Sequence, residues 1–274
     1  MDFKTKYGPY VIVTGASAGL GESFARELGA QGVNLVLVAR RESKIAALGK
    51  ELTAAHGIVV RTVALDLARE DAAEELARET ESLDIGAVIV NAAQILIGPF
   101  LDNDLTKEAN AFHLNTYALM QIAHRFGNRL RKRGRGGLLL VSSIIGFGAG
   151  PFQANYAATK AYVTSFGQAL HVELARSGVD VTVVAPGGMN TEGIQNSGYD
   201  FSALPMMDPR DVARIGVRAL GRRAIVVPGA LNAFTALLLK VLPRSVSARL
   251  FGSVVARMIA QRAQERPAKL TTRA

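Results

Sequence analysis

The chain has 274 residues, and its 49% hydrophobic content suits the core of one α/β domain and excludes a disordered chain. It contains no cysteine, which excludes disulfides, thiolate metal sites and cysteine nucleophiles. The first ten residues lack the apolar core of a signal peptide, and no apolar run reaches the roughly 18 residues of a membrane span. We therefore expect a cytoplasmic protein.

The net charge of +9 is concentrated in the last quarter of the chain. Residues 1–209 carry 19 Lys and Arg against 21 Asp and Glu, a net of −2, whereas residues 210–274 carry 13 against 2, a net of +11. No nucleic-acid-binding motif accompanies these basic residues, so we expect no nucleic acid partner. None of the four histidines shows metal-ligand spacing, and we expect no metal.

Apolar, β-branched runs alternate with helical patterns along the chain. The runs contain Val11, span Val33 to Ala39, end at Asp66, Asn91, Ser143 and Gly187, and resume at Ala224. The longest helical patterns cover residues 106–131 and 155–176. This alternation predicts a doubly wound, seven-stranded parallel sheet of the Rossmann type. We assign residues 1–229 to this α/β domain, with a substrate loop at about 188–208, and residues 230–274 to a helical extension.

A glycine-rich loop follows the first run, where Gly15, Gly19 and Gly21 are spaced G-x-x-x-G-x-G. Gly15 would permit a tight turn, Gly19 a close approach of a pyrophosphate, and Gly21 close packing of the next helix on the strand. The free N–H groups of that helix would then face phosphate. The competing interpretation is a tight turn without a ligand.

The end of the second run indicates which dinucleotide fits. An NAD-binding chain usually has a carboxylate here, but this chain has Ala39 followed by Arg40 and Arg41. A guanidinium suits the 2′-phosphate of NADP(H), and the hydroxyl of Ser17 would add a donor. The alternative is that both arginines are solvated residues at a helix start.

Tyr156 and Lys160 are four residues apart, so on a helix they share a face. A nearby ammonium favours the phenolate and is expected to lower the tyrosine pKa from its ordinary value of about 10. The pair would then suit proton transfer to and from an alcohol. Alone the spacing is weak, and a surface pair is the competing interpretation.

Two further polar residues complete this set. Ser143 ends the fifth run, where its hydroxyl would donate to a substrate oxygen. Asn115 lies inside a helical pattern, where an amide is a poor choice for helix propensity. The alternatives are a strand-end cap for Ser143 and a satisfied buried amide for Asn115.

Together these residues resemble the short-chain dehydrogenase/reductase family. The matching residues are Thr14, Gly15, Gly19, Gly21, Asp66, Asn91, Ala92, Ala93, Asn115, Ser143, Tyr156, Lys160, Pro186, Gly187 and Thr191. They cover about the first 190 residues in the family's order. One departure is visible: where the family usually reads Asn-Asn-Ala-Gly or Asn-Ala-Gly, this chain reads Asn91, Ala92, Ala93 and Gln94, so that a methyl replaces a hydrogen beside the cofactor.

The resemblance implies catalytic roles for Asn115, Ser143, Tyr156 and Lys160, and NADP(H) as cofactor. Lys160 would also bind the nicotinamide ribose, and Asn115 would hold a water in a proton relay to it. The implied cofactor-binding residues are Gly15, Ser17, Gly19, Leu20, Gly21, Arg40, Arg41, Asp66, Leu67, Asn91, Ala92, Ala93, Tyr156, Lys160, Pro186, Gly187, Met189 and Thr191. Asp66 and Leu67 would hold the adenine, and the segment from Pro186 to Thr191 would meet the nicotinamide.

The extension contains two helical patterns separated by Pro243. In the second pattern, Val246, Leu250, Val254 and Met258 recur at i+4 spacing, with Val255 and Ile259 beside them and arginines between. Three interpretations stay open: peripheral contact with an anionic membrane, a lid over the substrate cleft, and an interface in a homodimer or homotetramer.

Apolar residues surround the expected cleft. They are Ile95, Leu96, Ile97, Ile144, Ile145, Phe147, Phe152, Ile194, Tyr199, Phe201, Leu204, Met206 and Met207. Residues 188–208 contain no Lys or Arg that would meet a substrate carboxylate. We therefore expect an NADPH-dependent oxidoreductase acting on a bulky, hydrophobic ketone or secondary alcohol. The alternative is a non-catalytic NADP(H)-binding sensor or scaffold, which would have no need of the complete catalytic set.

Overall fold

The computed structural model describes residues 2–195 and 206–270, with the backbone only for residues 193, 258 and 261–270. Tyr199, Phe201 and Leu204 of the expected substrate loop lie outside the described residues. Within the described part, one parallel sheet has the strand order β3-β2-β1-β4-β5-β6-β7. The strands are β1 Tyr10–Thr14, β2 Asn34–Ala39, β3 Val60–Ala64, β4 Ile85–Val90, β5 Gly136–Val141, β6 Val179–Val184 and β7 Ile225–Val226. The predicted Rossmann-type α/β fold is confirmed.

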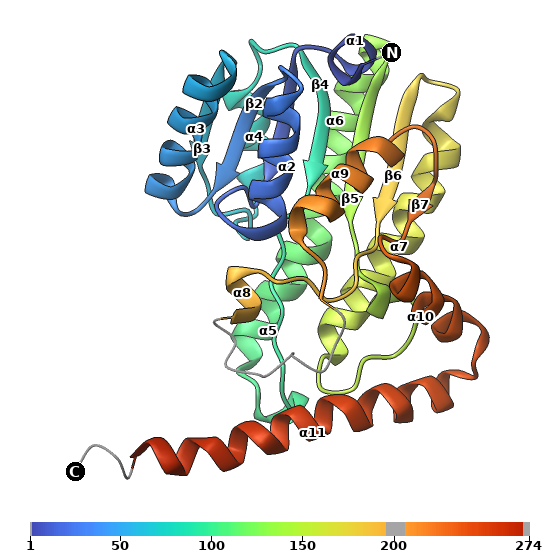
Figure 1. Ribbon diagram of the computed structural model, residues 1–274. Coiled ribbons are helices and arrows are strands. Elements are labelled where there is room, and N and C mark those ends of the chain that lie inside the picture. The colour runs from blue at the N-terminus through green and yellow to red at the C-terminus, as the bar shows by residue number, and fades with distance from the viewer. Residues whose placement is uncertain (1, 196–205, 271–274) are drawn as a thin grey trace.

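Helices connect the strands and cover both faces of the sheet (Figure 1). Those of the α/β domain are α1 Phe3–Tyr7, α2 Gly19–Ala30, α3 Glu42–His56, α4 Ala72–Glu79, α5 Leu105–Phe112, α6 Leu119–Arg133, α7 Ala154–Ala175, α8 Glu192–Gln195 and α9 Pro209–Ala219. Single turns form η1 Phe100–Asp102 and η3 Ile144–Phe147, and a π-helical stretch, η2 His113–Ala118, joins α5 to α6. The extension consists of α10 Ala230–Val241 and α11 Arg244–Leu270.

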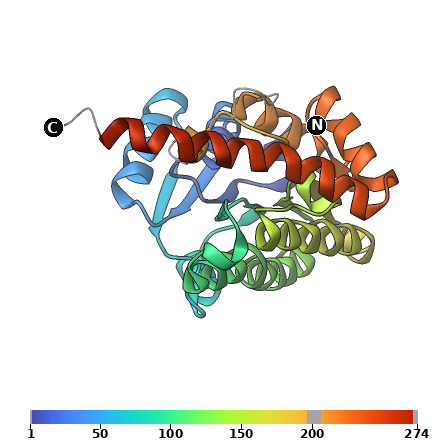
Figure 2. The same ribbon diagram turned by 90° about the horizontal axis from the view of Figure 1, so that it is seen from below.

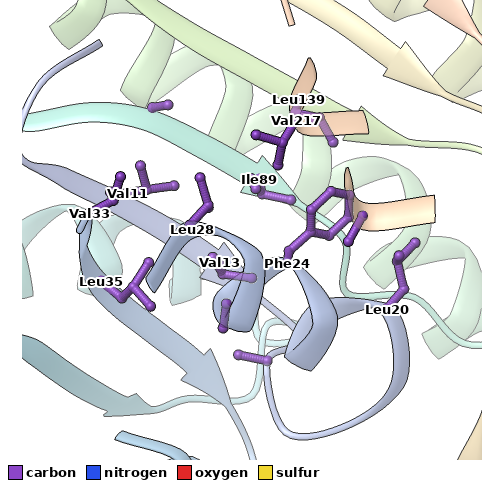
Figure 3. Packing of buried hydrophobic residues seen from close by; sticks show 14 of the residues in the cluster. Val11, Val13, Leu20, Phe24, Leu28, Val33, Leu35, Ile89, Leu139 and Val217 are labelled. Carbon is purple, nitrogen blue, oxygen red and sulfur yellow. The ribbon is translucent and has the colours of Figure 1, made fainter. Parts of the chain in front are cut away.

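Two apolar clusters hold the helices on the sheet. On one face, Phe24 and Leu28 of α2 and Val217 of α9 pack against β-strand residues such as Val13 (Figure 3). On the other face, side chains of α4, α6 and α7 pack around Phe126, which is fully buried. Because both faces are covered, the strand interiors are apolar at consecutive positions, as the sequence pattern indicated.

The structure differs from the predicted elements at three places. Helix α1, at the edge of the sheet opposite the strand carboxyl ends, was not expected from the sequence; the hydroxyl of its Tyr7 donates to Asp180 Oδ2 over 2.8 Å. The helix expected over 106–131 contains the π-helical stretch η2. Strand β7 has only two residues, because Pro228 soon follows and a proline lacks the N–H needed to extend strand pairing.

Helices α10 and α11 lie at the carboxyl edge of the strands, and α11 crosses beneath the α/β domain (Figures 1 and 2). The buried face of α11 contains Val255 and Ser247 rather than the predicted apolar row. Val246, Leu250 and Val254 of that row are exposed, the second of them by 58%. Helix α11 therefore presents apolar side chains on its outer face as well as packing inward.

No helix in the described part of the chain is both long enough and apolar enough to cross a membrane.

Candidate active site

The glycine loop turns tightly between β1 and α2. The N–H groups of Gly15 and Ala16 donate to Val38 O over 2.8 and 3.2 Å, which fixes the loop to the end of β2. A methyl group at Gly21 would collide with the carbonyl oxygen of Gly15, so only glycine lets α2 begin this close to the strand. The side chain of Leu20 is buried in the core, which leaves only its backbone to face a ligand.

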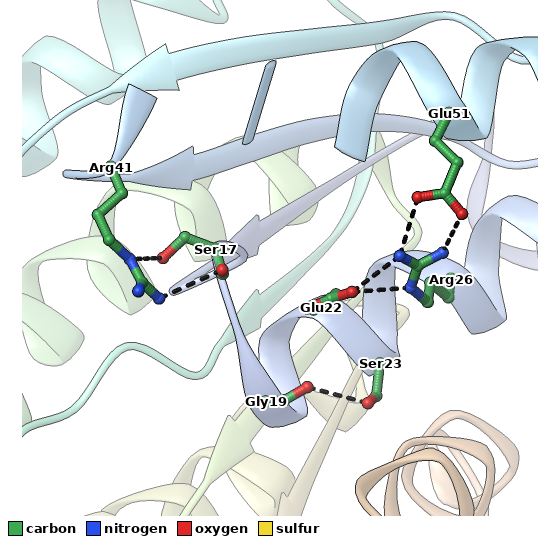
Figure 4. Close-up of polar contacts among 7 residues, drawn as sticks. All are labelled: Ser17, Gly19, Glu22, Ser23, Arg26, Arg41 and Glu51. Carbon is green, nitrogen blue, oxygen red and sulfur yellow. Dashed lines mark hydrogen bonds and ion pairs between the residues drawn. The ribbon is translucent and has the colours of Figure 1, made fainter. Parts of the chain in front are cut away.

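A guanidinium lies at the open side of this loop (Figure 4). Arg41 Nε donates to Ser17 Oγ over 3.2 Å, and Arg41 Nη2 donates to Ser17 O over 3.2 Å. Arg40 is exposed beside it at the end of β2. Of the two arginines, Arg41 is therefore the one that meets the predicted Ser17 hydroxyl.

Thr14 organises the end of β4, a role that the sequence reasoning missed. Its hydroxyl accepts hydrogen bonds from the N–H groups of Asn91 and Ala92 over 2.9 and 3.1 Å. In return, Asn91 Nδ2 donates to Thr14 O over 3.0 Å. The only sequence signal was a hydroxyl residue at the end of a buried strand. These bonds join β1 to β4, where the strand order reverses and such sheets bind dinucleotides. Ala93 follows as an exposed residue.

Asn115 lies in η2 and is 1% exposed. Its side-chain amide forms two hydrogen bonds with the backbone of Gln94. Asn115 Oδ1 accepts from the Gln94 N–H and Asn115 Nδ2 donates to Gln94 O, both over 2.8 Å. The same Nδ2 lies 3.2 Å from Thr159 Oγ1 on α7. Asn115 is thus a satisfied buried amide that also ties the loop after β4 to the helix that carries Tyr156.

Ser143, Tyr156 and Lys160 converge at the carboxyl end of β5. Ser143 Oγ donates to Pro186 O over 3.3 Å, and the Ser143 hydroxyl acts to lower the pKa of Tyr156. Lys160 Nζ lies 5.6 Å from the centroid of the Tyr156 ring and donates to Val141 O over 2.8 Å. The predicted catalytic residues are therefore brought together on β5, α7 and η2.

Burial dominates the ionisation of this pair. Although Tyr156 is only partly buried as a residue, desolvation of its hydroxyl raises the pKa to about 12, against a smaller lowering effect of the Ser143 hydroxyl. Desolvation also lowers the pKa of the Lys160 ammonium to about 8. The expected lowering of the tyrosine pKa is therefore wrong for the protein alone, because burial opposes both charged forms. At neutral pH Tyr156 holds its proton.

The two residues predicted to bind the adenine differ in how far their side chains are buried. Asp66 is partly exposed, and its carboxylate accepts the N–H of Ala68 over 3.1 Å. The side chain of Leu67 belongs to the core on the α4 and α6 face of the sheet. Only the backbone of Leu67 is therefore available to a cofactor.

The segment after β6 spans the site from Ser143 to the glycine loop. The carbonyl oxygen of Pro186 accepts from Ser143, and Met189 pairs with Met207 in an isolated bridge. Thr191 lies so close to Gly19 that a methyl there would stand 3.2 Å from Thr191 Cγ2. Residues 186–191 thus connect the end of β5 with the glycine loop.

Two side chains that the sequence reasoning missed support this arrangement. Asn232 of α10 packs on Gly187 so closely that a methyl at Gly187 would collide with the amide. The buried carboxylate of Glu108 accepts from Asn103 Nδ2 and from Asn155 Nδ2, each over 2.7 Å. Asn155 precedes Tyr156, so Glu108 anchors the first turn of α7. Neither residue belongs to a motif, which is why neither could be singled out from the sequence.

The extension packs on the segment that follows Ser143. Helix α10 packs on η3, and Lys240 Nζ lies 4.2 Å from the centroid of the Phe147 ring. In α11, Gly252 lies against Pro151, where an added methyl would stand 3.1 Å from the proline ring. The inner faces of both helices therefore contact the segment between Ser143 and Tyr156.

Residues 9–200 match the family model described as short chain dehydrogenase. The chain belongs to the short-chain dehydrogenase family. It is therefore an oxidoreductase. The family match covers the glycine loop, Ser143, Tyr156, Lys160 and residues 186–191, and ends before the extension.

Relatives cover nearly the whole chain. A 7beta-hydroxysteroid dehydrogenase of Clostridium sardiniense is 32% identical over 234 residues, covering 85% of this chain and 90% of the relative. A solved structure described in a study of 7beta-hydroxysteroid dehydrogenase stereoselectivity superposes with a TM-score of 0.85 at 26% identity, covering 92% of this chain and all of that one. A short-chain dehydrogenase from Sphingobium yanoikuyae, solved in complex with NADPH, superposes with a TM-score of 0.76 at 28% identity. The match covers 86% of this chain and 97% of that one.

Proposed function

We propose that this short-chain dehydrogenase is an NADPH-dependent reductase of a bulky, hydrophobic ketone, and that it catalyses the reverse oxidation of the corresponding secondary alcohol. The observation that carries the proposal is the convergence of Ser143, Tyr156 and Lys160 at the carboxyl edge of the sheet that also carries the glycine loop. A protein that only senses the cofactor would not need this acid/base set. The alternative of a non-catalytic NADP(H)-binding protein is the outcome that the assay below must exclude.

The cofactor site fits NADP(H) in shape and charge. The close packing of Gly21 on Gly15 leaves the N-terminus of α2 open to a pyrophosphate. Arg41 and Ser17 together offer guanidinium and hydroxyl donors to a 2′-phosphate. We propose that Arg40 contributes charge at the same end, and that Asp66 and the backbone of Leu67 contact the adenine. Residues 186–191 and Asn91 to Ala93 would line the remainder.

The mechanism follows from the protonation of Tyr156. When bound, the reduced nicotinamide supplies the hydride that reduces the carbonyl carbon. Ser143 would donate a hydrogen bond to the carbonyl oxygen, where negative charge develops. Tyr156, which holds its proton at neutral pH because burial raises its pKa, then donates that proton to the same oxygen. Lys160 would hold the ribose and, when charged, stabilise the phenolate that remains.

The proposed substrate class rests on the surroundings of Ser143. Ile145 is buried beside it, Phe147 is partly buried, and Ile95 is 38% exposed after β4. Apolar linings with few polar groups suit hydrophobic small molecules. The resemblance to a 7beta-hydroxysteroid dehydrogenase points to a rigid polycyclic compound of steroid size.

The test is turnover of a ketone panel that includes oxosteroids and small aliphatic ketones, followed by the loss of reduced nicotinamide absorbance. We expect NADPH-dependent turnover of the bulky ketones. The matched control is Tyr156→Phe, which keeps the ring and should lose roughly two orders of magnitude in rate while still binding NADPH. Tight NADPH binding without turnover of any ketone would favour the sensor, and equal activity of Tyr156→Phe would refute the assigned proton donor.

We also propose that residues 230–270 act as a wall of the substrate cleft and that their outer face rests on an anionic lipid surface. The inner faces contact the segment after Ser143. The outer faces expose apolar side chains beside basic ones. The exposed apolar residues of α10 and α11 are Leu231, Phe234, Leu237, Leu238, Val241, Val246, Leu250 and Val254. Residues 230–270 carry seven Lys and Arg against one Glu, a net charge of +6, and an apolar face within such a basic segment suits anionic headgroups.

Sedimentation with anionic and neutral vesicles at low and high salt tests the membrane contact. We expect binding to anionic vesicles that weakens with salt, and we expect Leu250→Glu to reduce it. Val172→Glu on α7 is the matched control, because Val172 is an exposed apolar residue far from the extension in sequence. No vesicle binding, together with a dimer or tetramer that Leu250→Glu dissociates, would assign the outer face to a homo-oligomer instead.

A further inference from the structure

Arg41 has a second partner besides Ser17. Its Nη1 donates to Glu192 Oε1 over 3.0 Å and to Oε2 over 3.3 Å. Glu192 begins α8, in the segment that follows β6, so the ion pair joins parts of the chain 151 residues apart. Both side chains remain substantially exposed to solvent, at 45% and 42%. A carboxylate thus occupies one branch of the guanidinium at the end of the glycine loop.

The arrangement divides the donors of Arg41 between two acceptors. Nε and Nη2 face Ser17, and Nη1 faces the carboxylate. A phosphate bound to a guanidinium takes the same planar pair of donors that a carboxylate takes. Two anions in one place repel each other, so a 2′-phosphate drawn to this guanidinium would weaken the pairing of Nη1 with the Glu192 carboxylate.

We propose that Glu192 is a specificity-determining residue that competes with the cofactor's 2′-phosphate for Arg41. Binding of NADPH exchanges the Arg41–Glu192 pair for an Arg41–phosphate pair, whereas binding of NADH leaves the protein pair intact. Glu192 therefore limits the preference for NADPH over NADH. The inference rests on the proposed role of Arg41 in the cofactor site.

The neighbourhood of Glu192 supports this competition. Thr191, directly before it, lies against Gly19 of the glycine loop, so the backbone of this segment is held at the cofactor site. The Arg41 guanidinium, with a smaller effect from Lys44, keeps the pKa of the Glu192 carboxyl below its usual range. Glu192 is therefore ionised at neutral pH and bears a full negative charge toward an incoming phosphate.

Affinities of NADPH and NADH for wild type, Glu192→Gln and Arg41→Ala test the proposal. Glu192→Gln keeps the shape and removes the charge, so NADPH should bind about twofold to fivefold more tightly, the range of exposed ion pairs, with NADH unchanged. Adenosine 2′,5′-bisphosphate should show the same gain, and 5′-AMP, which lacks the 2′-phosphate, should not.

Glu22→Gln is the matched control. Glu22 is a carboxylate in the first turn of α2, beside the same loop, but it pairs with Arg26 rather than Arg41 (Figure 4). Because Glu22 does not pair with Arg41, its removal should act mainly through the pyrophosphate that both cofactors carry, and the ratio of NADPH to NADH affinity should change much less than in Glu192→Gln. Unchanged NADH binding by Glu192→Gln also shows that the variant is folded.

The outcomes separate the inference from the function on which it rests. If Arg41→Ala weakens NADPH but not NADH, the 2′-phosphate site stands. Glu192→Gln then decides the inference: tighter NADPH binding supports it, while equal or weaker NADPH binding overturns it and makes Glu192 a residue that orients Arg41. If Arg41→Ala changes neither cofactor, the phosphate site itself is misassigned and the inference fails with it.

Discussion

Replacing Lys160 by methionine should make the cofactor-free protein more stable at neutral pH while removing its activity. Lys160 is 3% exposed and donates to Val141 O, but its ammonium has no carboxylate partner among the contacts that the structure gives it. Burial lowers its pKa from 10.5 to about 8. A buried ammonium is costly in the folded protein, and methionine has a similar length without the charge.

The size of the effect follows from the pKa. A pKa of about 8 in place of 10.5 corresponds to about 3 kcal/mol of destabilisation when the side chain is charged in both states. Methionine cannot make the hydrogen bond to Val141 O, and this loss offsets about 1 kcal/mol of the stability gained. At pH 7 we therefore expect Lys160→Met to raise the free energy of unfolding by about 2 kcal/mol.

The direction in which stability changes with pH follows from the lowered pKa of Lys160. The folded pKa of Lys160 is depressed, so the unfolded chain binds the proton more tightly, and the penalty is complete below about pH 8. It shrinks as the pH rises from about 8 towards 10.5, where the unfolded lysine also loses its proton. The advantage of Lys160→Met over wild type should shrink over the same range, and above about pH 10.5 the variant should be the less stable protein by about 1 kcal/mol because of the lost hydrogen bond.

Urea denaturation of both proteins without cofactor, at about pH 7 and at about pH 10, measures this difference. Lys50→Met is the matched control, because Lys50 is exposed on α3 and its removal should change stability little at either pH. If Lys160→Met is less stable than wild type at pH 7, or if its advantage does not depend on pH, the ammonium is not the destabilising group and the reasoning is refuted.

Three further outcomes follow. Gly21→Ala should lower the free energy of unfolding by about 2 kcal/mol or more and weaken dinucleotide binding, because the added methyl collides with Gly15. Thermal denaturation should compare it with Gly127→Ala, which has room in α6 and should be neutral or stabilising. Reduction should slow as the pH rises towards the Tyr156 pKa, because the proton donor is lost, and oxidation should quicken; pH profiles of both directions check the opposite slopes. Glu108→Ala should lower kcat more than it raises KM for the ketone, since its carboxylate anchors the first turn of α7, and Glu108→Gln should retain more activity.

The fold and the location of the site could be predicted because each depends on local patterns. The apolar runs and their alternation with helical patterns define the sheet, and residues after strand ends must meet at its carboxyl edge. The glycine spacing and the four-residue interval from Tyr156 to Lys160 are equally local. These features place the site without knowledge of any long-range contact.

What the sequence could not predict depends on contacts between distant segments. The pairing of Arg41 with Glu192 and the packing of Asn232 on Gly187 carry no pattern of their own. The Tyr156 pKa was misjudged because spacing reveals a neighbouring charge but not the burial that outweighs it. The apolar row of α11 was identified correctly as a row, but helical periodicity cannot say which of two apolar faces meets the domain.

The placement of the extension also has a consequence for the order in which the protein is built on the ribosome. All seven strands of the described sheet, and the helix with Tyr156 and Lys160, precede residue 230 and emerge from the ribosome first. Helices α10 and α11, which contact the segment beside Ser143, emerge last. A nascent chain can thus form the sheet edge that carries the glycine loop, Tyr156 and Lys160 before these helices exist, and the wall that we propose for the substrate cleft would be the last part to form.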